Sequence, residues 1–241
     1  MITRALPALL IAGVVHASSA DSAFAQEQPL PPVRATTGGA LLIAVPIGEF
    51  DDYIDTGWGL TGHFAIALDR HGIISLRADA SFVNYGNETR EVCFGGGVGC
   101  LITLDLTTSN NILSFQLGTQ ITVPDGIVRP YIHGGIGGSY FATTSSVEGS
   151  DNNNQPFAST TNFDDFTFSW TAGAGLRIPL SHGRTPVSLD LGARLLDNGE
   201  VEYLREGRII VDEDGSLILD PIRGEADLVK ILIGVSVGLR W

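Results

Sequence analysis

The apolar side chains of the last thirteen residues fall on odd positions, and mostly small or charged side chains fall on even ones. The odd positions are Val229, Ile231, Ile233, Val235, Val237, Leu239 and Trp241. Leu232 is the one apolar residue on the other face. A period of two is typical of a β-strand with one apolar and one polar face. The segment therefore predicts a C-terminal strand that ends on an aromatic ring.

Seven earlier segments alternate in the same way, so the chain predicts eight strands. Their approximate bounds are 38–47, 58–68, 73–85, a fourth segment that ends at 123, then 128–141, 166–180 and 187–196. About ten residues with this alternation suffice for a strand to cross a membrane in a barrel. A soluble barrel, with its apolar face inward, has the same number of strands and is the alternative.

The connections between these segments favour the membrane barrel. Those after the second, fourth and sixth segments are short, and those after the third, fifth and seventh are long and polar. Short periplasmic turns and longer outer loops are the expected asymmetry of an outer-membrane barrel. One irregularity is expected near 107–111, because Leu104 and Leu106 have the opposite parity to Leu113.

Residues 1–25 have the features of a signal peptide. Arg4 precedes an apolar run, and Ala23, Phe24 and Ala25 form a small-residue cleavage site. The run is too short to cross a membrane as a helix. We therefore expect a signal peptide over 1–25, an extended lead-in over 26–37, and a single barrel domain over 38–241.

Composition agrees with a lipid-facing surface. The chain is 44% hydrophobic but only 17% charged, against about 25% charged in a typical soluble domain. The formal net charge of −13 argues against nucleic acid as a partner.

These features together resemble the OmpA/OmpX-type family of eight-stranded outer-membrane proteins. The resemblance covers Gly38 to Trp241 and includes the segment 129–137, in which Pro130-Tyr131 precedes several glycines. It implies an all-β, closed, eight-stranded antiparallel up-and-down transmembrane β-barrel in the bacterial outer membrane. It also implies contact with outer-membrane lipid and lipopolysaccharide, and recognition of the Trp241 strand by the barrel-assembly machinery. The chain departs from the OmpA plan in ending at the barrel, and the resemblance implies no single activity.

The same alternation places a set of charged side chains inside the barrel. They are Arg77, Asp79, Arg129, Arg177, Asp190, Arg194 and Lys230, joined by His63, His133 and Arg240. An eight-stranded barrel is only wide enough for side chains to fill. We therefore favour a plug of partnered charges, because buried charges are normally paired. The alternative is a narrow pore that prefers anions, since bases outnumber acids.

The sequence offers little support for catalysis. An outer-membrane enzyme needs a nucleophile and a base close together near the outer rim. His133 and Ser139 share a strand face but lie roughly 20 Å apart along it, and His63, Asp164 and Asp165 complete no recognisable motif. We expect no enzymatic activity, no cofactor and no resident metal.

Two loop features stand apart from the barrel. Cys93 and Cys100 flank a glycine-rich segment and predict a local disulfide in a secreted chain. In the last loop, 208–211 and 216–219 surround an Asp-Gly turn and predict a hairpin. The acidic tip near Asp212 and Asp214 suits a divalent cation, but a solvated turn is the simpler explanation.

The sequence thus predicts a porin-like outer-membrane barrel with a structural or surface-interaction role. We expect a monomer with a side-chain-filled lumen whose loops are exposed outside and available to an extracellular partner. A narrow pore for small solutes is the alternative, and a lipid-modifying enzyme is a further one.

Overall fold

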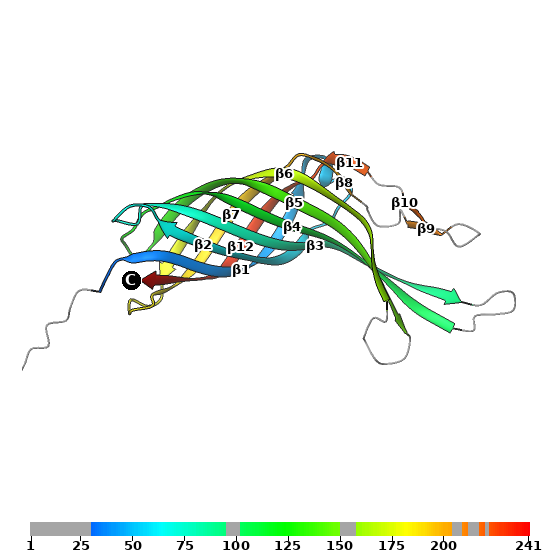
Figure 1. Ribbon diagram of the computed structural model, residues 1–241, viewed down its shortest axis with the longest axis horizontal. Helices are drawn as coiled ribbons and strands as arrows, with labels where there is room; N and C mark the ends of the chain where they lie inside the picture. Colours follow the sequence, from blue (N-terminus) through cyan, green and yellow to red (C-terminus); the bar gives the residue numbers. More distant parts are fainter. Residues whose placement is uncertain (1–29, 95–101, 150–157, 204–208, 212–216, 220–221) are drawn as a thin grey trace, which may run out of the picture.

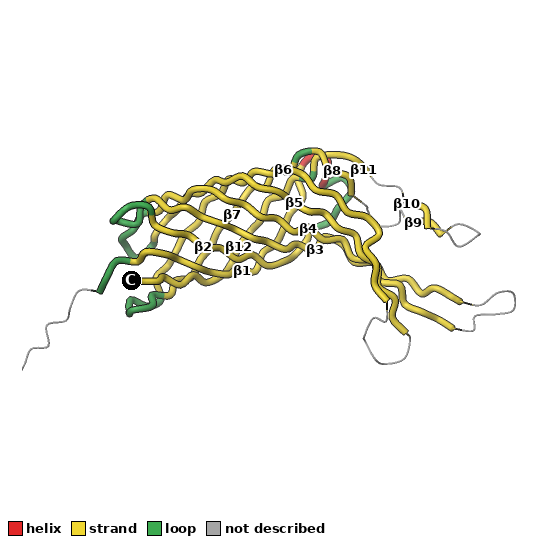
Figure 2. Tube along the Cα trace, in the orientation of Figure 1, coloured by secondary structure: helices red, strands yellow, loops and turns green. Residues whose placement is uncertain are grey.

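A computed structural model describes residues 30–94, 102–149, 158–203, 209–211, 217–219 and 222–241. Eight long strands form a closed barrel (Figures 1 and 2). They are β1 (Val33–Ile47), β2 (Gly57–Ala67), β3 (Ile74–Phe94), β4 (Ile102–Thr122), β5 (Arg129–Gly149), β6 (Ala158–Pro179), β7 (Val187–Asn198) and β12 (Asp227–Arg240). Every neighbouring pair is antiparallel, and β1 closes the barrel by pairing with both β2 and β12.

The predicted fold class is therefore confirmed.

Short elements lie at one end of the barrel. They are the 3-10 helix η1 (Gly48–Phe50), the pair β8 (Glu200–Tyr203) with β11 (Ile222–Glu225), and the hairpin β9 (Ile209–Val211) with β10 (Leu217–Leu219). The β9–β10 pairing is the hairpin predicted from the last loop. No helix in the described part of the chain is long and apolar enough to span a membrane.

The apolar faces of the strands point outward. On β12, Val235 is 49% exposed whereas its neighbour Ser236 is 3% exposed. The same outward orientation holds for Leu41, Leu60, Phe82, Phe115, Ile136, Phe168, Leu176 and Ile233. A soluble barrel would bury these side chains, so the observed orientation favours a barrel that is surrounded by lipid.

Glycines allow adjacent strands of the wall to approach closely. A Cβ atom on Gly118 of β4 would lie 1.9 Å from the carbonyl oxygen of Gly134 on β5, and one on Gly137 would lie 1.8 Å from that of Phe115. Neither position can therefore take a side chain without moving the backbone.

Four strands are much longer than the sequence indicated. β3, β4, β5 and β6 continue past the barrel at the end opposite the C-terminus (Figure 1). β2 pairs with β3 only as far as Trp58 and Asn84, so β3 from Gly86 onward pairs with β4 alone. The short turns lie at the other end, together with the C-terminus, and this end is therefore periplasmic.

The strand boundaries also differ at two places. β1 begins at Val33, inside the segment expected to be a lead-in. β4 is continuous through 107–111, and the register shift lies instead on β3, between Asn84 and Gly86. The bulge residue is Tyr85, which is buried. The pairing of β4 with β5 has no register shift, so Leu104 and Leu106 have the opposite parity to Leu113 within one regular strand, in the part that continues past the barrel.

Candidate functional site

A cluster of paired charges crosses the middle of the lumen. Arg77 of β3 donates to both carboxylate oxygens of Asp79, over 2.7 Å and 2.8 Å. Arg194 of β7 donates to Asp79 from the other side, over 2.7 Å. Because Arg77 and Asp79 are separated by two residues on one strand, the β-strand period places both on the inner face. One carboxylate thus joins β3 to β7 across the barrel.

A second group of partners extends this cluster. Asp190 accepts a hydrogen bond of 2.7 Å from the Tyr131 hydroxyl and one of 3.4 Å from Arg177. The Gln120 side-chain oxygen accepts from Arg77 at 2.5 Å and from Arg177 at 3.2 Å. The Arg177 guanidinium also lies 4.9 Å from the centre of the Tyr131 ring, within the range of a cation–π contact.

Inward glycines of β6 provide the space for these side chains. A Cβ atom on Gly175 would lie 2.4 Å from the Tyr131 ring, and one on Gly173 would lie 2.7 Å from Nε2 of His133. His133 and His63 both point inward and are buried. Lys230, also buried, donates to the Ser81 hydroxyl over 2.8 Å.

The structure brings six of the seven predicted lumen charges together and separates the seventh. Arg77, Asp79, Arg177, Asp190, Arg194 and Lys230 all lie in this buried layer, which we call the ionic layer. Arg129 lies nearer the periplasmic end and is only half-buried. Arg240 also lies there, where it donates to the backbone oxygen of Pro31.

Two residues of the ionic layer are absent from the charged set predicted from the sequence. Gln120 joins Arg77 to Arg177. Tyr131 binds Asp190. Their signal was available in principle, because a long polar side chain on an inner face must find a hydrogen-bond partner.

A second layer, made of apolar side chains, closes the outer mouth of the barrel. We call it the apolar plug. Its buried members are Leu42, Ala44, Phe50, Ile54, Val83, Tyr85, Ile112, Phe141, Leu196, Val201, Tyr203, Ala226, Leu228 and Leu232. The Phe50 ring packs edge-on against Tyr203 at 4.9 Å and lies 5.7 Å from Tyr85. The β1–β2 loop and β8 therefore fold inward over the lumen.

The two layers leave little space for water. The void between Arg77, Asp79, His133 and Thr171 is too small to hold a water molecule. Side chains therefore fill the space between these four residues.

The structure gives Ser139 other partners than the histidine predicted to share its strand face. The Ser139 hydroxyl lies 3.1 Å from the hydroxyl oxygens of Ser114 and Ser169. Nε2 of His133 has no hydrogen-bond partner among the described residues. Within the same residues, no group of three His, Cys, Asp or Glu side chains is placed to hold a metal ion.

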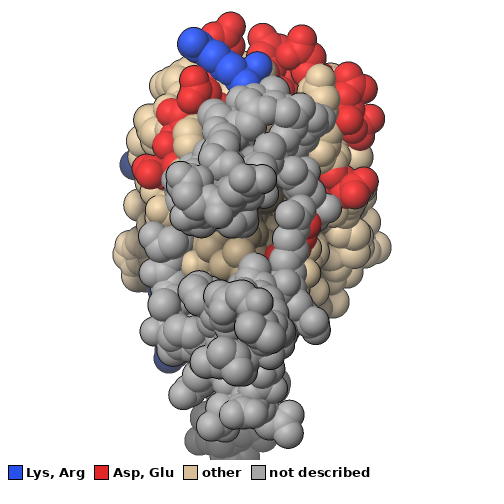
Figure 3. Space-filling view, turned by 90° about the vertical axis from the view of Figure 1, so that its right-hand side faces the viewer, with Lys and Arg blue, Asp and Glu red and all other residues tan. Residues whose placement is uncertain are grey.

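The outer rim carries an excess of negative charge. Figure 3 views this end and shows acidic side chains around its edge. The exposed acids there include Glu49, Asp51, Asp52, Asp55, Asp164, Glu200 and Glu225. Burial at the rim raises the pKa of Asp227, and the nearby carboxylates of Asp197 and Glu225 raise it further, against the lowering effect of the Asn198 N–H.

Two predicted loop features fall outside the described residues. Cys100 belongs to the segment 95–101, so the Cys93–Cys100 disulfide stays a prediction. The acidic tip near Asp212 and Asp214 belongs to 212–216, and so does the suggested divalent cation site. The signal peptide over 1–25 also lies outside the described range.

Comparison with known proteins gives one family and several similar folds. The family described as "Outer membrane protein beta-barrel domain" matches residues 8–202. No individual curated protein sequence matches the chain.

Three solved structures are similar to this chain at low sequence identity. Ail, the attachment invasion locus protein of Yersinia pestis, is 11% identical, with a TM-score of 0.42 over 86% of this chain and 99% of that one. Neisserial surface protein A is 9% identical, with a TM-score of 0.38 over 86% and 97%. A major outer membrane protein of Thermus thermophilus is 10% identical, with a TM-score of 0.39 over 85% and 99%.

Proposed function

The chain belongs to the outer membrane protein β-barrel domain family of bacterial outer membranes, and from this premise we propose that it is a surface-interaction protein. In this proposal the barrel is a closed anchor, and the outer ends of β3–β6 form the interacting part. The protein works as a monomer surrounded by outer-membrane lipid and lipopolysaccharide, and it carries out no catalysis.

The observation that carries this proposal is the extension of β3–β6 beyond the barrel. Past Gly86, β4 is the one described strand that pairs with β3. Among the described residues no strand pairs with its other edge, and a strand edge without a neighbouring strand is a template for an added strand. Two exposed side chains of this edge, Asn87 and Thr89, are polar and uncharged, and the same stretch of sequence also contains Glu88, Arg90 and Glu91. We therefore infer that the partner is an extended protein segment.

The filled lumen supports an anchor more than a pore. The ionic layer and the apolar plug lie one above the other along the barrel, and a solute would have to displace both. Planar-bilayer recordings test this point directly. The purified protein should give no steady conductance above that of the lipid alone, and a stable open channel would overturn the closed-anchor part of the proposal.

A shortened variant tests the interacting part. Replacing residues 88–108 with an Asn-Gly turn would join Asn87 to its pairing partner Ser109 and remove the outer third of each strand of the β3–β4 hairpin. Cells that display the full protein should be retained on a surface coated with unfolded casein, which supplies extended segments, several-fold better than cells with the shortened protein.

A matched control removes a different outer element. Replacing residues 209–219 with the same turn deletes the β9–β10 hairpin and leaves the β3–β6 extension intact. This variant should bind casein as the full protein does. Equal retention of all three kinds of cell, at equal surface amounts of folded barrel, would overturn the strand-addition proposal.

A further inference from the structure

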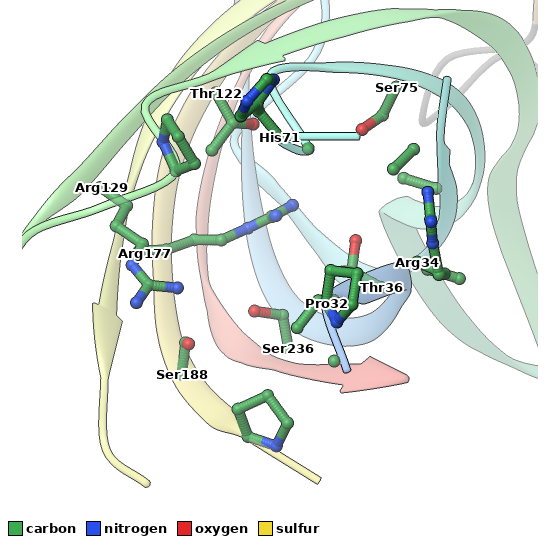
Figure 4. Close-up of a pocket in the computed structure, with 18 of the residues that line it drawn as sticks. Pro32, Arg34, Thr36, His71, Ser75, Thr122, Arg129, Arg177, Ser188 and Ser236 are labelled. Atoms are coloured by element: carbon green, nitrogen blue, oxygen red, sulfur yellow. The ribbon is translucent and has the colours of Figure 1, made fainter. Parts of the chain in front are cut away.

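The periplasmic mouth of the barrel contains a cavity that the anchor role does not use. It has a volume of about 250 Å³ and lies below the ionic layer, with Gln120 and Arg177 forming its inner end. Figure 4 shows Arg129 and Arg177 on one side of this cavity and Arg34 on the other. We propose that this cavity is a binding site for a phosphate group, held by arginines from several strands and turns.

The charge of the cavity is opposite to that of the chain. Five arginines line it: Arg34, Arg70, Arg129, Arg177 and Arg240. Asp125 is the one carboxylate among the lining residues. The chain as a whole has a formal net charge of −13. Overall composition therefore does not explain a gathering of arginines, and the local potential favours an anion.

Several of these arginines have hydrogen-bond donors to spare. In the described part of the structure, Arg34, Arg70 and Arg129 form no ion pair with any carboxylate, Asp125 included. The Nε atoms of Arg129 and Arg240 are buried and have no hydrogen-bond partner there. A buried donor without a partner is unfavourable, because it has lost its hydrogen bonds to water and gained none in the protein. An oxygen atom of a ligand that accepts these bonds would remove that cost.

Phosphate is the oxyanion that suits this set of donors best. Guanidinium groups bind phosphate oxygens in pairs of parallel hydrogen bonds, and a phosphate has oxygens enough for more than one arginine. Hydroxyl groups complete the lining: Thr36, Ser75, Thr122, Ser188 and Ser236 surround the arginines (Figure 4). The cavity exceeds one phosphate in size, so small phosphate esters also fit. The filled ionic layer above makes it a closed-ended site.

A phosphate titration in neutral detergent tests the proposal. The isotope-labelled full barrel is titrated with inorganic phosphate at constant ionic strength, and the arginine Nε–H resonances are followed by NMR. The Arg129 resonance should shift and saturate. Arg129→Gln and Arg34→Gln should each weaken binding at least fivefold, whereas Arg184→Gln should change it less than twofold, because Arg184 lies at the same end but outside the cavity.

Separate controls test whether the variants fold and where the bound phosphate comes from. Arg129 and Arg34 are half-buried and unpaired by carboxylates, so both variants should keep the heat-modifiable gel mobility of a folded barrel. Bicelles with phosphatidylglycerol, but no inorganic phosphate, test a lipid headgroup as the source. A saturable shift there assigns the site to a headgroup phosphate, and a shift only with inorganic phosphate assigns it to a soluble one.

Two results would overturn the site. One is a shift of Arg129 that stays linear with phosphate and never saturates in either arm. The other is an equal loss of affinity in Arg184→Gln, which would mean that diffuse positive charge, and not this cavity, attracts the anion. Neither result bears on conductance or on casein binding, so the failure of this site is distinguishable from failure of the proposed surface role.

Discussion

Removing the Asp79 carboxylate should destabilise the barrel far more than removing an exposed one. Asp79 accepts three charge-assisted hydrogen bonds, two from Arg77 and one from Arg194. Arg77 is only 1% exposed, so water cannot replace the lost carboxylate. Breaking a buried ion pair from one side costs about 3–5 kcal/mol, because the remaining charge is left without compensation. We expect Asp79→Ala to lower the free energy of unfolding by about that amount.

The cost should disappear when the whole group is replaced. In Arg77→Met/Asp79→Leu/Arg194→Met no charge of the group remains, and Gln120 still accepts a hydrogen bond from Arg177. Replacing a buried ion network by apolar side chains of similar volume is often neutral or stabilising. The triple variant should therefore unfold close to the wild type, although it too lacks the Asp79 carboxylate.

Urea unfolding in detergent micelles measures both effects, with tryptophan fluorescence and gel mobility as independent probes. Asp125→Ala, an exposed turn carboxylate without an ion pair among the described residues, is the control. Exposed ion pairs contribute up to about 1 kcal/mol to the free energy of unfolding. If Asp79→Ala lowers the free energy of unfolding by less than this, water reaches the ionic layer. A triple variant as unstable as the single one would refute the assignment of the cost to unpaired arginines.

Four further perturbations test other parts of the structure. Val235→Arg should reduce stability in bilayers by about 2–4 kcal/mol, because Val235 faces lipid. The control variant Ser236→Arg should insert normally, and equal insertion defects in the two variants would contradict the assigned faces. Phe50→Ala should cost about 3–5 kcal/mol in urea unfolding, yet conductance should stay at background because the ionic layer remains. Burial raises the pKa of Asp227, so the protonated carboxyl stabilises the folded state. This stabilisation is lost as the pH rises through the raised pKa. Asp227→Asn should therefore stabilise near pH 7, a gain that disappears below the ordinary carboxyl pKa of about 4. Trp241 is 68% exposed. Deleting it should strongly reduce assembly into the outer membrane of cells, but should change the urea stability of the barrel folded in detergent only slightly. Normal accumulation of the shortened protein in the outer membrane would contradict a role of Trp241 as an assembly signal.

The part of the fold that lies at membrane depth could be predicted because lipid and lumen impose opposite chemistry on alternate residues. Ile233 and Val235 face outward and Lys230 and Ser236 face inward, each as the period of two required. A slip of one residue would reverse every side chain. The contrast between the two faces thus determines the orientation of each strand.

Outside the membrane that contrast disappears, and so does the sequence signal. β3 runs on to Phe94 and β5 to Gly149, whereas the alternation was readable only as far as Tyr85 and Phe141. The added residues of β5 include Thr143, Thr144 and Ser145, which suit either face. Backbone pairing continues there without a pattern of apolar and polar residues to reveal it.

The apolar plug escaped prediction for a related reason. Leu232 stood out as an exception to the alternation, yet it is buried together with Leu42 and Ala44 at the outer mouth of the lumen. These residues pack against side chains of the η1 loop and of β8, whose inward fold the local sequence does not specify. The sequence contained one signal of this plug: several strands have apolar residues at inner-face positions near the same end.

The two layers of the lumen stabilise different parts of the molecule, and this division connects the fold to the proposed role. The ionic layer joins β3, β6 and β7 across the barrel at membrane depth through Asp79 and Asp190. The apolar plug instead contacts the base of the outer extension, since Tyr85 and Phe141 belong to it and to β3 and β5. We therefore expect disruption of the ionic layer to weaken the barrel at membrane depth, and disruption of the plug to weaken the outer end of the barrel and to loosen the loops that pack on it. The proposed surface role would use both layers, because the ionic layer holds the anchor together and the plug supports the base of the extension.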